Sequence, residues 1–102
     1  MKAVAAWRFR CPYTREGMRD RLNALGPWRW SDRDSDRLGE YLSTRAIADH
    51  GMIKIFEEPA HWVLNVVLDA EETVVKATLD TLFQQLLPGL EATVLGETDP
   101  WE

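Results

Sequence analysis

The chain has little cysteine, little histidine and no long apolar run, and each shortage excludes a class of protein. Cys11 is the one cysteine among 102 residues, which excludes an internal disulfide and a cysteine-based metal cluster. No apolar run approaches the ~20 residues that a membrane span needs, and residues 1–8 are too short an apolar stretch for a signal peptide. We therefore expect a cytoplasmic protein that has no membrane partner.

Motifs that define a chemistry are also missing. The sequence contains no G-x-S-x-G, H-E-x-x-H or C-x-x-C motif and no glycine-rich phosphate loop. The two histidines, His50 and His61, have no neighbour in sequence that would complete a catalytic pair, and a lone cysteine beside a turn is typical of a structural residue. The sequence therefore favours a non-enzymatic protein with no catalytic residue and no cofactor.

Basic residues are scarce in the second half of the chain. Residues 1–45 hold ten basic and six acidic side chains, whereas residues 46–102 hold only Lys54 and Lys76 against eleven acidic ones. Either the two halves interleave so that the charges pair, or the fold has a split surface that steers a charged partner. The acidic second half would repel phosphates, so we expect no nucleic-acid partner.

The composition, 45% hydrophobic and 28% charged, is typical of one folded domain. We assign residues 1–97 to a single α+β domain and residues 98–102 to a polar tail. A strand is predicted at 61–68, and its two largely apolar faces indicate a central position. An amphipathic helix follows over 70–87, with a capping box at Asp69 and Glu72 and a stop at Pro88-Gly89.

The remaining elements have weaker signals. Residues 2–9 alternate as a strand with Val4, Ala6 and Arg8 on one face, and Thr14 is a good N-cap for a helix that ends at Gly26-Pro27. Residues 52–57 and 90–95 have strand composition. Residues 38–47 fit either a helical stripe or a strand; we favour the strand, because a turn at 49–51 would join it to its neighbour.

The order is therefore β-α-(β)-β-β-α-β, which without the bracketed strand is the ferredoxin-like arrangement. We predict an antiparallel sheet of four or five strands with two helices on one face. Residues 32–37 have no apolar side chain and predict a solvated loop. Asp32, Asp34 and Asp36 have calcium-loop spacing, but Arg37 and Ser43 stand where the loop needs Gly and Glu, so no metal site is expected.

Tryptophan supplies the main functional signal, because Trp28 and Trp30 stand beside arginines, as in many recognition surfaces. The alternative is that one of them covers the open end of the core. Our leading hypothesis is a non-enzymatic domain that binds a protein partner, or a second copy of itself, through the sheet and the segment 28–37. An inhibitor or immunity-type antidote of a basic partner is one form of it, suggested by the acidic second half.

The candidate binding residues are Trp28, Arg29, Trp30, Arg33, Tyr41, Arg45, His61 and Trp62. A second hypothesis is a small-molecule-binding domain or a cofactor-free enzyme of the dimeric α/β-barrel type. Its cleft would lie between sheet and helices and be lined by His61, Tyr41, Trp30 and Arg45.

Overall fold

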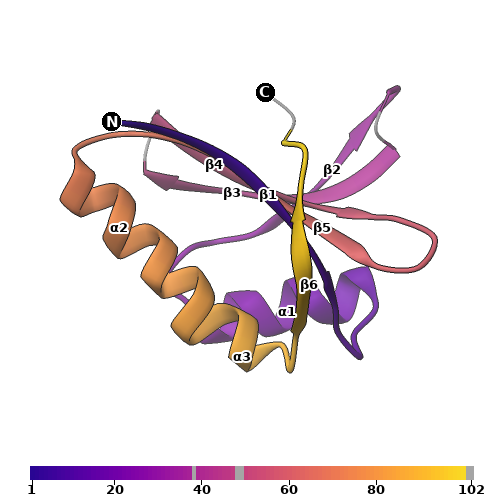
Figure 1. Cartoon of the computed structure of the whole chain (residues 1–102). Helices are drawn as coiled ribbons and strands as arrows, with labels where there is room; N and C mark the ends of the chain where they lie inside the picture. Colours follow the sequence, from indigo (N-terminus) through magenta and orange to yellow (C-terminus); the bar gives the residue numbers. More distant parts are fainter. Residues whose placement is uncertain (38, 48–49, 101–102) are drawn as a thin grey trace.

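Six strands form one antiparallel sheet, and two helical segments lie on the same side of it (Figure 1). The computed structural model describes residues 1–37, 39–47 and 50–100. Leu38, Asp49 of the predicted turn, and residues 101 and 102 of the predicted tail lie outside the described residues. The strands are β1 (Lys2–Arg10), β2 (Ser31–Ser35), β3 (Gly39–Ile47), β4 (Gly51–Glu57), β5 (Trp62–Asp69) and β6 (Thr93–Thr98). The helical segments are α1 (Arg15–Leu25) and a continuous run of α2 (Glu72–Thr81), η2 (Leu82–Leu86) and α3 (Leu87–Gly89).

The prediction of a ferredoxin-like sheet with four or five strands is wrong. The sheet has six strands in the order β2-β3-β4-β5-β1-β6. Four consecutive strands separate α1 from α2, whereas the ferredoxin-like arrangement has two strands between its helices. The coarser prediction of a small α+β domain is confirmed.

The additional strand is β2, which the sequence predicts as a solvated loop. Its five residues contain no hydrophobic side chain, and only Ser35 is partly buried. The segment nevertheless pairs with β3, from Ser31 opposite Ser43 to Ser35 opposite Gly39. A strand ladder is made by backbone N–H and C=O groups and needs no apolar side chain. A charged strand without apolar residues is therefore compatible with the outer edge of a sheet.

Two predictions for the middle of the sheet are confirmed. Residues 39–47 form strand β3, which pairs with β4 in antiparallel register. Strand β5 lies between β4 and β1, and it is buried on both faces. Leu64 and Val66 belong to the main core beneath the helices, whereas Val63 and Asn65 are buried on the opposite face.

Helix α1 forms as its local sequence predicts. The Thr14 hydroxyl accepts a hydrogen bond from the Gly17 N–H at 3.1 Å, which caps the first turn. Met18 and Leu22 are buried on the inner face. The helix ends at Gly26, whose φ of 66° lies in the left-handed region that glycine adopts readily.

The second helical run departs from its prediction at both ends. Asp69 is the last residue of β5 and lies opposite Lys2, so the strand ladder holds the residue that the capping box would have used. The helix begins at Glu72 without a side-chain cap. At the other end it continues through Pro88 to Gly89 by way of the π-helical segment η2. The last strand consequently begins at Thr93, three residues later than predicted.

The apolar side chains divide into two clusters on opposite faces of the sheet. The main core lies between the inner face of the strands and the two helical segments, α1 and the run α2–η2–α3. The second cluster consists of Ala6, Phe56 and Val63, with Tyr41 packed against it, and includes no helix residue. Among the described residues, none of the helices has the length and apolar character that a membrane crossing requires.

Truncation inside the main core should destabilise the domain strongly. Leu64 is 1% exposed, so Leu64→Ala should lower the free energy of unfolding by about 2–5 kcal/mol through lost burial and an unfilled cavity. Val74 is 41% exposed, so Val74→Ala should change the free energy of unfolding by less than about 0.5 kcal/mol. Urea denaturation of the two variants measures this difference, and equal losses would contradict the core assignment.

Candidate functional site

The predicted binding segment 28–37 lies partly in the core and partly at the surface. Trp30 is 2% exposed and belongs to the main core. Its backbone is held by Asn23, whose side-chain oxygen accepts from the Trp30 N–H at 2.6 Å and whose amide group donates to the Trp30 carbonyl at 3.1 Å. The indole N–H of Trp30 has no hydrogen-bond partner among the described residues. This tryptophan therefore lies where a partner does not reach it.

Trp28 and Arg29 lie nearer the surface, on the helical side of the sheet. Trp28 is half-buried against the main core, and it lines a shallow groove of about 290 Å³ together with the α2 residues Thr73, Val74, Ala77, Thr78 and Thr81. Arg29 is exposed, and its carbonyl accepts a hydrogen bond from the Thr44 hydroxyl at 2.7 Å. The groove is open and carries no charged lining residue.

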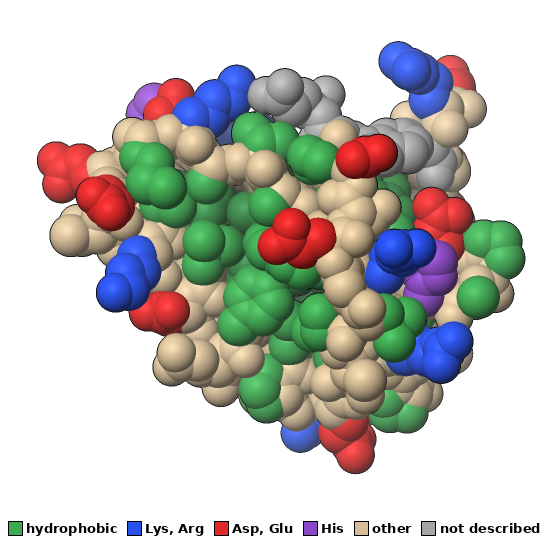
Figure 2. Space-filling view, in the orientation of Figure 1, with side chains coloured by type: hydrophobic (Ala, Val, Ile, Leu, Met, Phe, Trp, Pro, Cys, Tyr) green, Lys and Arg blue, Asp and Glu red, His purple; other side chains and the backbone are tan. Residues whose placement is uncertain are grey.

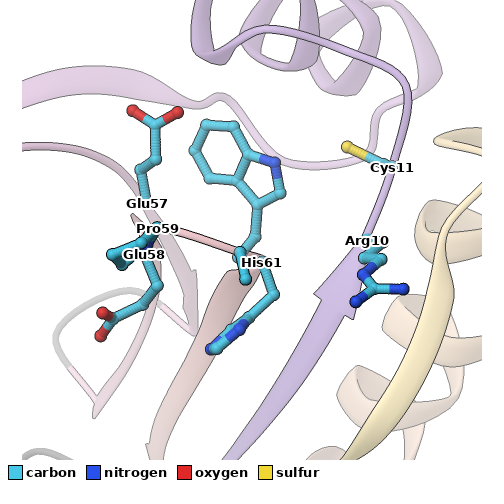
Figure 3. A pocket seen from close by; sticks show the side chains of 8 residues that line it. Arg10, Cys11, Glu57, Glu58, Pro59 and His61 are labelled. Atoms are coloured by element: carbon cyan, nitrogen blue, oxygen red, sulfur yellow. The ribbon is translucent and has the colours of Figure 1, made fainter.

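His61 and Trp62 lie at one end of the sheet, beside a pocket of about 300 Å³ between the end of β1 and the β4–β5 turn. Figure 3 shows Arg10 and Cys11 on the β1 side and His61 on the side of the turn. The carboxylates of Glu57 and Glu58 point in opposite directions, and the His61 ring points away from Cys11. The pocket therefore contains no paired carboxylates and no thiol–imidazole pair.

The Cys11 thiol in this pocket is not activated as a nucleophile. Partial burial raises its pKa above the usual value, and hydrogen bonding with the Tyr13 backbone offsets this only in part. A raised pKa leaves less of the reactive thiolate at neutral pH.

Arg33, Tyr41 and Arg45 share the outer face of the sheet, the face opposite the helices. Strand register shows how they come together, because residues opposite one another on neighbouring strands lie on the same face. Arg33 on β2 lies opposite Tyr41 on β3, which lies opposite Phe56 on β4. Phe56 lies opposite Val63, a member of the outer cluster. We call this surface the open face, because no helix of the described chain packs on it.

The open face consists of three rows across the strands. The first row is Arg33, Tyr41, Phe56, Val63, Arg8 and Gly96; the second is Ser31, Ser43, Lys54, Asn65, Ala6 and Thr98; the third is Arg45, Met52, Val67 and Val4. Four of these residues are basic and none is acidic. The next carboxylate in register on this face is that of Asp69, at the end of β5 opposite Lys2.

An aromatic cluster lies among these basic residues. The ring centroids of Tyr41 and Phe56 are 5.1 Å apart, and the ammonium nitrogen of Lys54 lies 5.6 Å from the Tyr41 centroid, which is within cation–π range. Phe56 and Val63 are 9% and 7% exposed although no helix covers them. The cluster is therefore already packed in the absence of a partner, and half-buried Tyr41 is its accessible part.

Asp32 of β2 and Glu40 of β3 are paired with arginines of α1 on the other side of the sheet. Arg19 pairs with Asp32, and Arg15 pairs with Asp32 at 3.5 Å and with Glu40 at 2.9 Å. These hydrogen bonds and charges hold the pKa of Asp32 below its usual value. By contrast, Arg8 and Arg33 on the open face make no ion pair with any described residue.

Sequence reasoning missed Arg8, Lys54 and Phe56 as members of this surface. The alternation in residues 2–9 placed Arg8 with Val4 and Ala6, and the same alternation in β4 places Lys54 with Phe56. Only the strand order brings these two sets beside Arg33 and Tyr41. Among residues 1–37, 39–47 and 50–100, no group of three or more His, Cys, Asp or Glu side chains could hold a metal ion.

Comparison with known proteins adds no family assignment: no protein-family model matches the chain, and no curated protein matches it significantly.

The Cys11 thiol should react slowly with alkylating agents. Because burial raises its pKa, the alkylation rate with iodoacetamide at pH 7.5 should be at least about threefold below that of a short cysteine peptide. Unfolding in urea should remove the difference. A folded-state rate equal to or above that of the peptide would contradict the description of Cys11 as an inactive thiol.

The Asp32 ion pairs should contribute stability that depends on pH in the acid range. Because the folded-state pKa of Asp32 is lowered, its contribution is fully present above the unfolded-state pKa and is lost as the pH falls through the folded-state pKa. In a carboxyl ¹³C NMR titration, the pKa of Asp32 should lie below that of an ordinary aspartate, and Arg19→Gln should raise it. Arg21, which donates to the Gly89 carbonyl, offers the control Arg21→Gln, which should leave Asp32 unchanged.

Proposed function

We propose that this chain is a non-enzymatic protein-binding domain whose contact surface is the open face of the sheet. The observation that carries the proposal is the charge of that face: its rows hold Arg8, Arg33, Arg45 and Lys54 and no carboxylate, in a chain with 17 acidic and 12 basic residues. Charge complementarity of this kind steers association and suppresses wrong partners. The partner is therefore a protein with an acidic surface.

The aromatic cluster supports the same proposal. Tyrosine and arginine are enriched among residues that dominate binding energy, typically near the centre of an interface. Here Tyr41 is already held against Phe56 and beneath the Lys54 ammonium group. A side chain packed in advance loses little conformational freedom on binding, which favours affinity.

A second copy of the chain is a poorer occupant of this face. In a symmetric dimer, the same surface patch meets itself, so the basic rows of one copy would face the basic rows of the other. Like charges in contact across an interface cost several kcal/mol. The charge pattern therefore favours an acidic partner over homodimerisation through the open face.

The small-molecule hypothesis has less support. Of its four expected lining residues, only His61 lines the pocket at the end of the sheet. Trp30 is in the core, and Tyr41 and Arg45 are on the open face. The volume of about 300 Å³ is at the lower limit for ligand pockets, and three of the eight lining residues, Arg10, Glu57 and Glu58, are charged.

Charge reversal on the open face should strongly reduce the capture of an acidic partner. The experiment quantifies the proteins that co-purify with the tagged wild-type chain, Arg33→Glu and Lys76→Glu from an extract of the source organism. The amount of an acidic protein captured by the wild type should fall at least about tenfold with Arg33→Glu, because like charges across an interface disfavour binding, and should persist with Lys76→Glu. Lys76 is the matched control because it is exposed on α2.

Three outcomes would contradict the proposal. One is a capture profile that the two variants change equally, another is a captured partner with a basic surface, and the third is sedimentation of the wild type as a dimer that Arg33→Glu dissociates. Thermal melts establish that both variants fold, because surface substitutions of this kind change the free energy of unfolding by about 0.5 kcal/mol or less.

A further inference from the structure

Strand β6 forms an outer edge of the sheet, and its backbone on the outward side is distinct from the open face. It is last in the strand order, and within the described residues its ladder partner is β1. The outward backbone N–H and C=O groups of such a strand have no ladder partner, so an edge is a template for the addition of another strand.

The two edges of this sheet differ in how they are protected. Strand β2 consists of serine, aspartate and arginine residues, and charged side chains of this kind prevent unwanted pairing. Strand β6 instead carries Val94 and Leu95, which are 42% and 45% exposed. They are two of the four large hydrophobic side chains that are exposed among the described residues. The β6 edge thus presents exposed apolar side chains, which the β2 edge lacks.

An apolar surface borders this edge on the helical side. Figure 2 shows hydrophobic side chains gathered between α2 and β6. The half-buried side chains of Trp7 and Phe83 meet there edge to face, with ring centroids 4.8 Å apart. Val94 lies opposite the core residue Phe9 and so faces the same side. Alternate side chains of an added strand would contact this apolar surface.

The charge around the edge identifies the occupant. After Lys76 the chain contains no lysine or arginine. The exposed carboxylates of Glu91, Glu97 and Asp99 lie just before, within and just after β6. Glu97 lies opposite Trp7 on the helical side, whereas the exposed Arg8 and Arg10 of β1 lie on the open face. A second copy paired through β6 would bring a second set of the same carboxylates to the interface, whereas a basic segment would neutralise them.

We propose that the β6 edge binds an extended segment of another protein, with alternating apolar and basic residues, as a seventh strand of the sheet. Backbone hydrogen bonds to β6 would supply part of the affinity, and the alternate side chains would supply specificity. This inference concerns the outward backbone of β6 rather than the open face, and it does not depend on the function proposed above.

The test uses a capped ten-residue peptide of alternating valine and lysine as the probe, titrated into the ¹⁵N-labelled protein. Chemical shifts should change in β6 and β1, and the amide protons of β6 should exchange more slowly with solvent. The same peptide with glutamate in place of lysine should bind at least about tenfold more weakly at low salt. A lysine peptide N-methylated on alternate residues should also lose binding, because it lacks the backbone donors.

A matched pair of variants locates the site. Val94→Lys should weaken binding of the lysine peptide at least about tenfold. Val74→Lys introduces the same change at a residue of α2 with nearly the same exposure, 41% against 42%, and should leave binding unchanged.

The proposal is overturned if the glutamate peptide binds as tightly as the lysine peptide, or if the shifts fall on the Trp28 groove or on β2, β3 and β4 of the open face. Equal losses with the two variants would also overturn it. So would a wild-type dimer that Val94→Lys dissociates, because a second copy would then occupy the edge. Arg33→Glu should not affect peptide binding, which keeps the result separate from the test of the open face.

Discussion

The packing of two helical segments on one face of the sheet is the interaction on which the rest of the structure depends. Buried leucines and valines of α2 and its continuation, together with Met18 and Leu22 of α1, meet the inner side chains of β3, β4, β5 and β1 in one apolar cluster. Burial of each such side chain is worth about 1.5–3 kcal/mol. Because both helical segments are used on this side, the outer face is left to the side chains of the strands alone.

The two proposed surfaces differ in charge, and most charged residues of one lie several strands away from those of the other. The molecule measures 34 × 28 × 25 Å, whereas the Debye length is about 8 Å at physiological ionic strength. The basic residues on β2, β3 and β4 lie three or more strands from β6 and are largely screened from the carboxylates beside it, whereas Arg8 lies directly opposite Gly96 of β6. An acidic protein and a basic segment could each be attracted to its own side. The basic first half and acidic second half of the sequence thus correspond in part to two surfaces of the fold.

Sequence reasoning succeeded where a local signal determines the structure. Thr14 caps α1, and the two-sided apolar pattern of β5 reports its central position. It failed at Ser31–Ser35, because an edge strand needs no apolar residue, and at Asp69, because strand pairing with Lys2 overrode the capping box. The sequence placed Trp30 among the binding candidates, whereas the core holds it. The grouping of Arg33 and Tyr41 with Arg8 depends on strand order, which no local pattern encodes.

The position of β1 between β5 and β6 also determines when this domain can fold. Lys2 pairs with Asp69 and Ala6 pairs with Thr98. Strand β1 therefore cannot complete its pairing until β5 and β6 have been synthesised. At about 5–20 residues per second, roughly 3–12 s pass before β5 exists. Until then Trp7 and Phe9 have no sheet to join, and closing such distant pairs is slow. The arrival of the last third of the chain therefore sets the earliest moment at which the native sheet can form.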